Sequence, residues 1–458
     1  EGGASLEHVL DELRAELGDA LVTDPVDLDA LRADKSGRVS ASAPLALVEA
    51  REVAHVQAAL RWASRHRVPV VPRGAGTGLA GGAIGEQGEL VVSTARMNRI
   101  LEISPEDELA VVEAGVINAD LNVALAAHGL WYAPDPASRA ISTIGGNIAT
   151  NAGGLMCVKY GVTREAVLGL KLVLPDGRLL ELGHRTVKGV TGYDLTALVI
   201  GSEGTLGIVV EATLRLRPLA RGEVVTVSVA FPDVESAARA SAAITASGVR
   251  PAALELLDAS ATAAIGEYLG VALAGAQLLV QTDGASAPEE ADAVAAIATA
   301  HGGIAQRAAD AAEGERLFAI RRAFHPAMER QGAVLIEDVA VPRSAMPAMF
   351  AAIGDIERRF GIRIPTVAHA GDGNLHPNFV VEDAAGGHLD VPEHVWAAAD
   401  ELFRACLRLG GTLTGEHGVG TLKRRWLREE LGDDAFELQR RIKAVFDPAG
   451  IMNPGKVF

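Results

Sequence analysis

Aromatic residues, cysteines and long apolar runs are scarce in this 458-residue chain. Aromatic residues make up 4% of it, so few side chains are available to stack on nucleic-acid bases. Cys157 and Cys406 are the only cysteines, which excludes a disulfide framework or a cysteine-based metal cluster and favours a reducing, cytoplasmic location. No stretch approaches roughly 18 uncharged apolar residues, so we expect no membrane span, while peripheral association with a membrane stays compatible with the sequence.

Basic side chains are also in the minority. The chain has 42 lysines and arginines against 59 aspartates and glutamates, a formal net charge of -17. A surface of this sign repels a phosphate backbone, so we exclude nucleic acid as a partner. Apolar residues make up 49% and charged residues 22% of the chain, as in folded globular proteins, and its length predicts two or three domains.

A glycine-rich loop over residues 73–82 follows a short apolar strand at 68–72. Gly76, Gly78 and Gly81 match the spacing of the dinucleotide fingerprint. A Rossmann unit needs a helix that begins inside this motif, whereas here the loop continues to the next strand at 90–92. We therefore reject NAD on a Rossmann fold and predict a nest of backbone amides that holds a pyrophosphate.

A second tract rich in small residues covers residues 134–154. A flexible linker is one interpretation of this composition. Against that interpretation, apolar residues are spaced through the tract, together with asparagine and threonine. Backbone packed closely against a flat ligand explains the pattern better.

Apolar strands recur up to Arg217 and Pro218, where we place the end of the first domain. Beyond it, residues 225–307 follow the order strand, helix, strand, short helix, strand, helix, strand, which is typical of a ferredoxin-like fold. We then expect a helix at 317–328, a strand at 334–341 and a helix at 396–409. The predicted domains are residues 1–219, residues 220–420 and a C-terminal segment, 421–458, that packs back on the first domain.

Two histidines flank a predicted hairpin turn. His369 and His376 stand beside two short apolar strands around a Gly-Asp-Gly-Asn sequence. Antiparallel pairing sets the two histidines near each other, and the period of two places Asn378 on the same face as His376. For this pair alone, ordinary polar hairpin residues are an equally good interpretation.

Residues 415–418, Gly-Glu-His-Gly, supply two more titratable groups. Glycines on both sides of Glu416 and His417 are more typical of a site than of a solvated loop. Two imidazoles and the Glu416 carboxylate form a three-ligand set with an open position, as expected for a metal that must contact substrate. His417 is then the natural general base, because an imidazole titrates near neutrality.

Several of these motifs occur in one fixed order: both glycine tracts, Gly-Ser-Glu-Gly-Thr-Leu-Gly-Ile at 201–208, the histidine hairpin, Gly-Glu-His-Gly, and Asn-Pro-Gly-Lys at 453–456. In this order the chain resembles the FAD-linked 2-hydroxy acid dehydrogenases of the vanillyl-alcohol-oxidase superfamily. Within that group it is most similar to glycolate oxidase catalytic subunits, D-lactate dehydrogenases and D-2-hydroxyglutarate dehydrogenases. The resemblance covers nearly the whole chain. It implies an α+β protein with a PCMH-type FAD-binding domain, a ferredoxin-like substrate domain and a C-terminal helical segment that returns to the flavin.

The resemblance also implies roles for individual residues. The family's metal ligands, usually to zinc, fall on His369, His376 and Glu416, its catalytic base on His417 and a substrate contact on Asn378. We expect noncovalent FAD, because the glycine loop lacks the histidine of covalently flavinylated relatives. The residues expected to contact FAD are Arg73, Gly74, Ala75, Gly76, Thr77, Gly78, Leu79, Pro134, Asp135, Ser142, Gly145, Gly146, Asn147, Thr150, Asn151, Gly153, Gly154, Glu203, Gly204, Ile208 and Asn453.

Two further positions bear on the substrate. Arg321 matches the arginine with which such proteins hold the substrate carboxylate, and a guanidinium suits a planar carboxylate. Its neighbour Arg322 has the character of a solvated helix residue. Dehydrogenases of 2-hydroxyglutarate carry a lysine where this chain has Ile336, beside Glu337 and Asp338. A second substrate carboxylate would lose its partner there and meet acidic neighbours, which favours D-lactate or glycolate over D-2-hydroxyglutarate.

The implied reaction is hydride transfer from the substrate C2 to flavin N5, with His417 taking the hydroxyl proton. The electrons then pass to an acceptor that the sequence does not identify: a quinone, a cytochrome or an electron-transfer protein. A homodimer or a partner subunit is compatible with the sequence. Two alternatives stay open, a metal-dependent hydrolase or lyase that uses the same His/His/Glu set, and an electron-transfer subunit with a vestigial site. The two glycine tracts argue against the hydrolase, which has no need of them.

Overall fold

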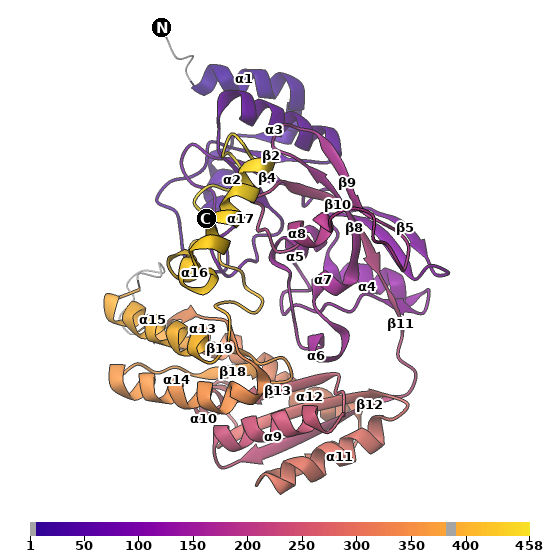
Figure 1. Ribbon diagram of the computed structural model, residues 1–458, viewed down its shortest axis with the longest axis vertical. Helices are drawn as coiled ribbons and strands as arrows, with labels where there is room; N and C mark the ends of the chain where they lie inside the picture. The colour runs from indigo at the N-terminus through magenta and orange to yellow at the C-terminus, as the bar shows by residue number, and fades with distance from the viewer. Residues whose placement is uncertain (1–5, 382–390) are drawn as a thin grey trace. The chain divides into compact units, whose positions relative to one another are not determined.

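The computed structural model describes residues 6–381 and 391–458. The chain forms two compact units, each built from separate stretches of sequence. The first unit comprises residues 1–152, 162–219 and 417–458, and the second comprises residues 153–161 and 220–416. Figure 1 labels many of the elements of both units.

The first sheet of the first unit carries the glycine loop. Its strands lie in the order β1 (Leu21–Val22), β2 (Ala46–Glu49), β4 (Leu90–Ser93) and β3 (Val70–Arg73), with β2, β4 and β3 parallel. Helices α1 (Leu6–Leu17) and α3 (Val53–His66) contribute Leu13, Leu60 and Trp62 to the same buried core as Val70 and Val92. Residues 74–89, all of them described, contain no helix, which confirms that the loop is not a Rossmann turn.

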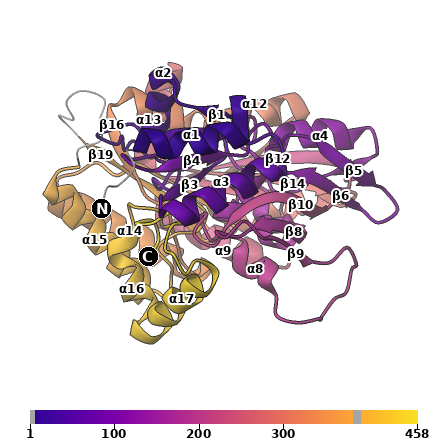
Figure 2. The ribbon, with the colours of Figure 1, turned by 90° about the horizontal axis from the view of Figure 1, so that it is seen from above.

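The second sheet of the first unit is antiparallel throughout. Its order is β5 (Ile100–Ser104), β6 (Leu109–Glu113), β10 (Ile208–Arg215), β8 (Val167–Val173) and β9 (Leu179–Gly183), and these strands run side by side in Figure 2. Smaller elements accompany the two sheets: α2 (Pro25–Asp29) packs with the first sheet, and the others are α4 (Asn118–Ala126), β7 (Leu130–Trp131), α7 (Thr163–Ala166), α8 (Leu195–Val199) and β11 (Arg217–Pro218).

The second small-residue tract is not a linker. It contains helix α5 (Ile144–Thr150), whose first turn is capped by the Thr143 hydroxyl, which accepts a hydrogen bond from Gly146 N at 3.2 Å. Ile144 and Ile148 are fully buried in the core beneath the second sheet. The apolar residues spaced through the tract therefore anchor this helix.

The C-terminal stretch belongs to the first unit. Helices α16 (Arg424–Leu431) and α17 (Asp433–Phe446) precede a final segment that runs beside β3. Val70 N donates to Ile451 O at 2.8 Å, and Asn453 N donates to Val70 O at 2.7 Å. The Lys443 ammonium donates to Asp447 Oδ2, Thr205 O and Met452 O, which fixes α17 to the same segment.

The second unit contains one continuous antiparallel sheet. Its order is β15 (Ile304–Arg307), β12 (Glu223–Phe231), β14 (Ala276–Gly284), β13 (Ala253–Leu257), β18 (Thr366–His369), β19 (Asn374–Val381) and β16 (Ala333–Ile336). The first four strands, with helices α9 (Val234–Ala246), α10 (Ala259–Leu269) and α11 (Ala287–Ala300), confirm the predicted ferredoxin-like order. The histidine hairpin β18–β19 extends that sheet from the edge of β13.

Three predicted elements of the second unit differ from the structure. The helix expected at 317–328 is two helices, α12 (Ala311–Arg322) and α13 (Phe324–Arg330), because Pro326 cannot donate a backbone hydrogen bond and instead stands in the first turn of α13. The strand expected at 334–341 is divided into β16 and β17 (Val339–Ala340) by Glu337 and Asp338. Helix α14 (Met346–Phe360) was not predicted, and α15 (Glu393–Arg408) begins before the predicted residue 396.

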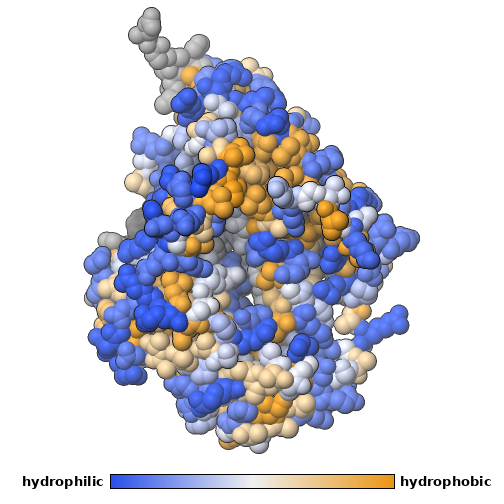
Figure 3. Space-filling view, viewed as in Figure 1, coloured by the Kyte–Doolittle hydropathy of each residue, from blue (hydrophilic) through white to orange (hydrophobic). Residues whose placement is uncertain are grey.

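Among residues 6–381 and 391–458, no helix combines the length and apolar character needed to cross a membrane. Hydrophilic residues cover most of the face shown in Figure 3, with smaller apolar patches between them.

The partly buried Asp258 makes the stability of the second unit depend on pH. Its carboxylate caps α10 by accepting from Ala261 N at 2.7 Å and also accepts from Thr366 N at 3.1 Å. Burial raises the pKa of Asp258 to about 7. An aspartate in the unfolded chain titrates near 3.9. Between these values the folded state keeps a proton that the unfolded chain has released, so this contribution to stability falls as the pH rises from about 4 to about 7.

We expect Asp258→Asn to remove that fall. Asparagine keeps the cap but cannot ionise, so the melting temperature of the variant should decrease less between pH 5 and pH 8 than that of the wild type, by roughly 2 to 4 °C. Thermal unfolding at several pH values measures the difference. Parallel curves for the two proteins would show that Asp258 does not retain its proton in the folded state.

Candidate active site

The two predicted histidines meet on the hairpin of the second unit. In the β18–β19 ladder Val367 faces His376, and His369 faces Asn374, so the histidines are diagonal neighbours on one face. Their ring centroids lie 5.0 Å apart with planes at 84°, and both side chains are buried. Gly373 allows the tight turn between them, because its φ is +77° and a Cβ there would lie 2.1 Å from Val341 O. The predicted hairpin is therefore confirmed.

Glu416 reaches both histidines from the end of the second unit. Its Oε1 lies 3.3 Å from His369 Nε2 and 3.2 Å from His376 Nε2. One ligand atom from each of the three residues lies within 4.8 Å of the others, which is compatible with a shared metal ion. The sequence-predicted ligand set is therefore assembled by residues about forty positions apart in the chain.

Each histidine has a buried carboxylate behind it, and neither of these carboxylates was predicted as a site residue. His369 Nδ1 lies 2.7 Å from Glu255 Oε1, and Glu255 stands directly opposite His369 in the β13–β18 ladder. His376 Nδ1 lies 3.7 Å from Asp338 Oδ1. The one signal in the sequence was an acidic residue alone in an apolar run, as Glu255 is within Ala253–Leu257. The hydrogen bond to Glu255 orients His369 Nε2 toward Glu416, whereas Asp338 lies at ion-pair distance from His376 Nδ1.

Asp338 also fixes the backbone of the Glu416 loop. Its Oδ2 accepts from Glu416 N at 2.9 Å and from the Thr414 hydroxyl at 2.6 Å, and its Oδ1 accepts from Asn374 Nδ2 at 2.7 Å. The division of the expected strand at Asp338 thus has a structural use, because this residue joins the hairpin turn to the loop that carries Glu416.

The charges of this cluster are strongly coupled. Burial opposes a charge on His369, but the carboxylates of Glu255 and Glu416 outweigh it and raise the pKa of His369 well above its ordinary value. Burial likewise opposes ionisation of Glu416, and His369 and His376 overcome it and lower the pKa of Glu416. Glu416 is therefore a carboxylate at neutral pH, and the cluster attracts positive charge, whether protons or a cation.

Arg321 and Asn378 lie in the same unit. Arg321 Nε donates to Glu255 Oε2 at 2.8 Å, and the arginine side chain is 13% exposed. Asn378 is buried, donates to His376 O at 2.9 Å and pairs with Ile336 in the β16–β19 ladder. Ile336, the position expected to distinguish this chain from 2-hydroxyglutarate dehydrogenases, is thus the cross-strand neighbour of a predicted substrate contact.

In the first unit the two glycine tracts are in contact. A Cβ on Gly74 would lie 2.5 Å from Thr143 Oγ1, and one on Gly76, where φ is +68°, would lie 2.2 Å from Arg73 Nη2. The Arg73 guanidinium donates to Ala83 O at 2.7 Å and Ala33 O at 3.0 Å, which holds the loop in place from within. A larger side chain at Gly74 would push the two tracts apart, and one at Gly76 would collide with Arg73 in the same loop.

Three of the residues predicted at FAD have an unusual backbone. Asn151, Glu203 and Asn453 have φ of 50°, 53° and 45°, a left-handed conformation that costs energy for residues other than glycine. Asn453 Nδ2 donates to Glu203 O at 2.8 Å and to Gly82 O at 3.0 Å, so three segments distant in sequence meet there. Such strained positions cluster at ligand sites.

The Glu203 carboxylate is occupied by the chain itself. Its oxygens accept from Val419 N at 3.0 Å and Gly420 N at 2.9 Å. Burial raises the pKa of Glu203 to about 7. The other predicted residues differ in environment: Ile208 packs into the core of the first sheet, Gly204 rests on Pro72, and Asn118 Nδ2 donates to Pro134 O at 3.0 Å.

Two predicted groups are divided between the units. Gly153 and Gly154 belong to the second unit, whereas the rest of their tract belongs to the first. The division at the other end falls between Glu416, in the second unit, and His417, in the first.

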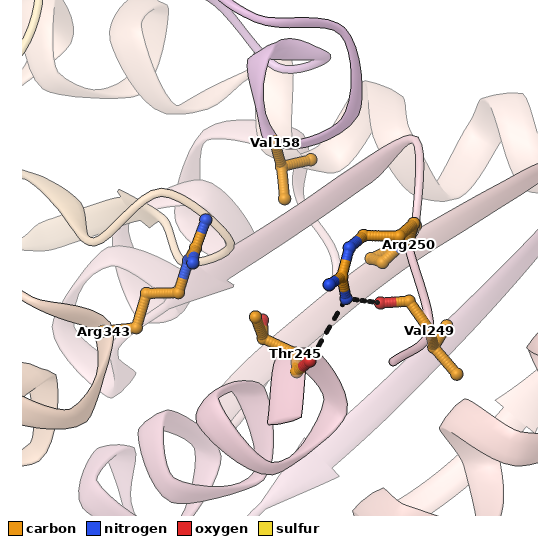
Figure 4. A pocket seen from close by; sticks show the side chains of 6 residues that line it. Val158, Thr245, Val249, Arg250 and Arg343 are labelled. Carbon is orange, nitrogen blue, oxygen red and sulfur yellow. Dashed lines mark hydrogen bonds between the residues drawn. The ribbon is translucent and has the colours of Figure 1, made fainter. Parts of the chain in front are cut away.

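A pocket of about 210 Å³ lies elsewhere in the second unit. It is lined by Val158, Thr245, Val249, Arg250, Pro251 and Arg343. Figure 4 shows the Arg250 and Arg343 side chains on opposite sides of it, with Arg250 Nη1 donating to Thr245 O and Val249 O. Arg343 Nε donates to Gly371 O, in the turn between the two histidines, so its guanidinium braces that turn.

Two family models match the chain. One, described as the FAD binding domain, matches residues 44–183, and the other, described as the C-terminal domain of FAD linked oxidases, matches residues 221–457.

Similar proteins cover almost the full length. A glycolate oxidase subunit GlcD from Bacillus subtilis is 42% identical over 91% of this chain and 89% of its own length. A D-2-hydroxyglutarate dehydrogenase from Xanthomonas citri pv. viticola is 38% identical over 96% of this chain and 94% of its own. Among solved structures, p-cresol methylhydroxylase with substrate bound has a TM-score of 0.79 at 18% identity, covering 100% of this chain and 98% of that one, which shows the shared fold.

Proposed function

Since the chain belongs to the FAD-linked oxidases, we propose that it oxidises a small D-2-hydroxy acid, D-lactate or glycolate, to the 2-oxo acid with noncovalent FAD as hydride acceptor. The observation that carries this proposal is the convergence of His369, His376 and Glu416, with a carboxylate behind each imidazole. A site of this kind is built to hold a divalent cation beside a reacting oxygen.

His369, His376 and Glu416 would hold that cation, and zinc is the ion we favour. Two imidazole nitrogens and one carboxylate oxygen are a donor set that zinc accepts, and three protein ligands leave a position for substrate. Glu255 holds His369 Nδ1 through a hydrogen bond, so that the Nε2 atom of His369 would face the ion, and Asp338 places a negative charge 3.7 Å from His376 Nδ1. When bound, the cation supplies stabilisation of negative charge on the 2-hydroxyl oxygen, and FAD supplies the acceptor for the C2 hydride.

His417 is the proposed base. It follows Glu416 directly in the chain, so a ligand position and a proton acceptor are provided by consecutive residues. The imidazole would take the proton of the 2-hydroxyl as the C2 hydride leaves, and Asn378 would contact the substrate.

Arg321 is the proposed partner of the substrate carboxylate. Its Nε is engaged by Glu255, which fixes the side chain and leaves the edge formed by the two Nη atoms to face a carboxylate. The same Glu255 thus supports both His369 and Arg321.

We expect Arg321→Met to raise KM about tenfold to a hundredfold with a smaller effect on kcat, since a charge-assisted hydrogen bond contributes about 1.5–3 kcal/mol. Steady-state kinetics measure the two constants, and metal content checks that Glu255 still supports His369. Arg321→Lys keeps the charge but lacks the bidentate edge, so its KM should lie between those of the wild type and Arg321→Met. An unchanged KM in Arg321→Met would place the carboxylate partner elsewhere.

The FAD site is proposed at the two glycine tracts. Residues 73–79 would hold the pyrophosphate through backbone amides, residues in 142–154 would contact the flavin ring and ribityl chain, and Glu203, Gly204 and Ile208 would lie toward the adenosine, with Asn453 as a further FAD contact. The strained backbone at Asn151, Glu203 and Asn453 supports this assignment. We accordingly propose residues 1–219 as the FAD-binding domain, 220–420 as the substrate and metal domain, and 421–458 as a segment that completes the FAD domain.

Ile336 is the basis for preferring a monocarboxylic substrate over D-2-hydroxyglutarate. It pairs with Asn378, and the acidic Glu337 and Asp338 follow it, so a second carboxylate would find no cation at this position.

The assay that tests the function uses an artificial electron acceptor with D-lactate, glycolate and D-2-hydroxyglutarate, and identifies the 2-oxo acid formed. We expect turnover with a monocarboxylate and a gain of activity toward D-2-hydroxyglutarate in Ile336→Lys, with Ile336→Met as the uncharged control. Wild-type preference for D-2-hydroxyglutarate would contradict the role given to Ile336 and favour the alternative substrate.

The natural electron acceptor is proposed to be a quinone, a cytochrome or an electron-transfer protein. The relative from Bacillus subtilis is named a subunit, which supports a partner subunit that carries electrons onward. A homodimer is the alternative assembly. Cys157 and Cys406 are not joined in a disulfide, in keeping with the cytoplasmic location that we propose.

A further inference from the structure

A short segment of the second unit crosses over from the sequence of the first. Residues Gly153–Gly161, here called the strap, belong to the second unit, although residues on both sides of the strap belong to the first. The strap contains one helical turn, α6 (Cys157–Tyr160). Leu155 packs against the core formed by Ala253, Leu257 and Phe318, which places the strap over β13.

One buried carboxylate holds the end of the strap. Asp283, near the end of β14 and 6% exposed, accepts hydrogen bonds from the Lys159 ammonium and from the Tyr160 hydroxyl. Lys159 Nζ is also 3.4 Å from Asp283 O. Two consecutive strap residues thus share one acceptor, and charge-assisted bonds to a buried carboxylate are among the strongest that a protein forms.

The other end of the strap touches the candidate metal ligands. A Cβ on Gly153 would lie 2.7 Å from Glu416 Oε2 and 3.4 Å from Glu416 Cβ. Val158 packs on the histidine turn, because a Cβ on Gly371 would lie 2.3 Å from Val158 Cγ2. The strap therefore forms a wall against the Glu416 carboxylate and against the turn that follows His369.

We propose that Asp283 is a positioning residue for Glu416, which it influences through the strap: the Lys159 and Tyr160 contacts hold Gly153 against the carboxylate and so keep Glu416 aimed at the two imidazoles. This inference rests on the proposed metal site. The backbone of Glu416 is held separately, by the hydrogen bond from Glu416 N to Asp338. That hydrogen bond does not restrain rotation of the Glu416 carboxylate. A ligand whose supporting residues are loosened binds its ion less tightly, typically by 10- to 100-fold.

The experiment measures metal affinity in the full-length, FAD-loaded protein by competition with a chelator, first with Zn²⁺ and then by the visible absorption of a Co²⁺-substituted sample. We expect Asp283→Ala to weaken Zn²⁺ binding about tenfold or more and to change the Co²⁺ spectrum. Asp258→Asn is the matched control, since the Asp258 carboxylate also accepts hydrogen bonds beside the same sheet but has no contact with the strap among them. It should bind Zn²⁺ as the wild type does.

Three further variants keep the test decisive if Asp283→Ala does not fold. Lys159→Met and Tyr160→Phe each remove one of the two contacts and should each weaken Zn²⁺ binding by a smaller factor. Gly153→Ala should displace the Glu416 carboxylate directly and weaken Zn²⁺ binding without any change at Asp283. Wild-type affinity and an unchanged Co²⁺ spectrum in these variants would overturn the inference while leaving the metal site intact. A wild-type protein that binds no divalent metal would overturn the metal site itself, and the inference with it.

Discussion

Replacing His417 with alanine should lower the rate of flavin reduction by substrate about 10²- to 10⁴-fold while FAD remains bound, because the variant has no group to accept the 2-hydroxyl proton. The base acts only as the hydride leaves, so kcat should fall much more than KM rises. Anaerobic stopped-flow mixing of the oxidised protein with substrate measures the rate, and the flavin absorption before mixing shows whether FAD is retained.

His128→Ala is a suitable control for this variant. His128 is an exposed residue of the first unit, the unit to which His417 belongs. The control should reduce its flavin at the wild-type rate. Near-normal flavin reduction in His417→Ala would remove His417 from the mechanism and require another proton acceptor.

Glu416→Gln should weaken binding of the divalent metal by at least about a hundredfold, since loss of a direct ligand should exceed the 10- to 100-fold cost of losing an outer partner. Glu416 is the one anionic member of the proposed ligand set, and the histidines lower its pKa so that it is charged at neutral pH. The amide of glutamine has a similar shape but no charge, so the variant separates the charge from the packing.

Metal content after gel filtration and chelator competition provide the measurement. Glu255→Gln is the graded comparison, because Glu255 contacts His369 Nδ1 and would not itself bind the metal, and its effect should be smaller. Metal binding by Glu416→Gln equal to that of the wild type would show that the ion, if bound, does not use the His369, His376 and Glu416 set.

The histidine hairpin could be predicted because its signals are local. Two short apolar strands, a Gly-Asp-Gly-Asn turn and the period of two were enough to place His369 and His376 on one face. The ferredoxin-like order was predictable for the same reason, since each strand and helix has its own periodicity. Glu416 required a further signal, the glycines on both sides of it and the resemblance to known dehydrogenases.

Glu255 and Asp338 could not be found in this way. Glu255 supports His369 only because β13 pairs with β18, and these strands are more than a hundred residues apart in the chain. The sequence of neither strand indicates which strand pairs with it, so a buried glutamate in an apolar run was the one local sign of a site. Asp338 could not be predicted for a related reason: the sequence pattern indicates one strand at 334–341, whereas the structure divides it at Asp338.

The glycine fingerprint is the opposite case, in which a clear local motif does not by itself predict the fold or the cofactor. Gly76, Gly78 and Gly81 have the spacing of a Rossmann turn, but the next element along the chain is β4 and not a helix. The strand that follows the motif correctly excludes a Rossmann turn, whereas the glycine spacing alone would have indicated the wrong cofactor.

The visible spectrum of the purified protein under anaerobic conditions tests the proposed function most directly. D-lactate, glycolate and D-2-hydroxyglutarate are added to separate samples, and the flavin band near its usual visible maximum is followed. We expect a flavin spectrum that bleaches promptly with D-lactate or glycolate. A flavin spectrum that none of the three acids bleaches would contradict the proposed substrate class. A protein that cannot take up FAD at all would contradict both the FAD site proposed at the glycine tracts and the flavin-dependent reaction.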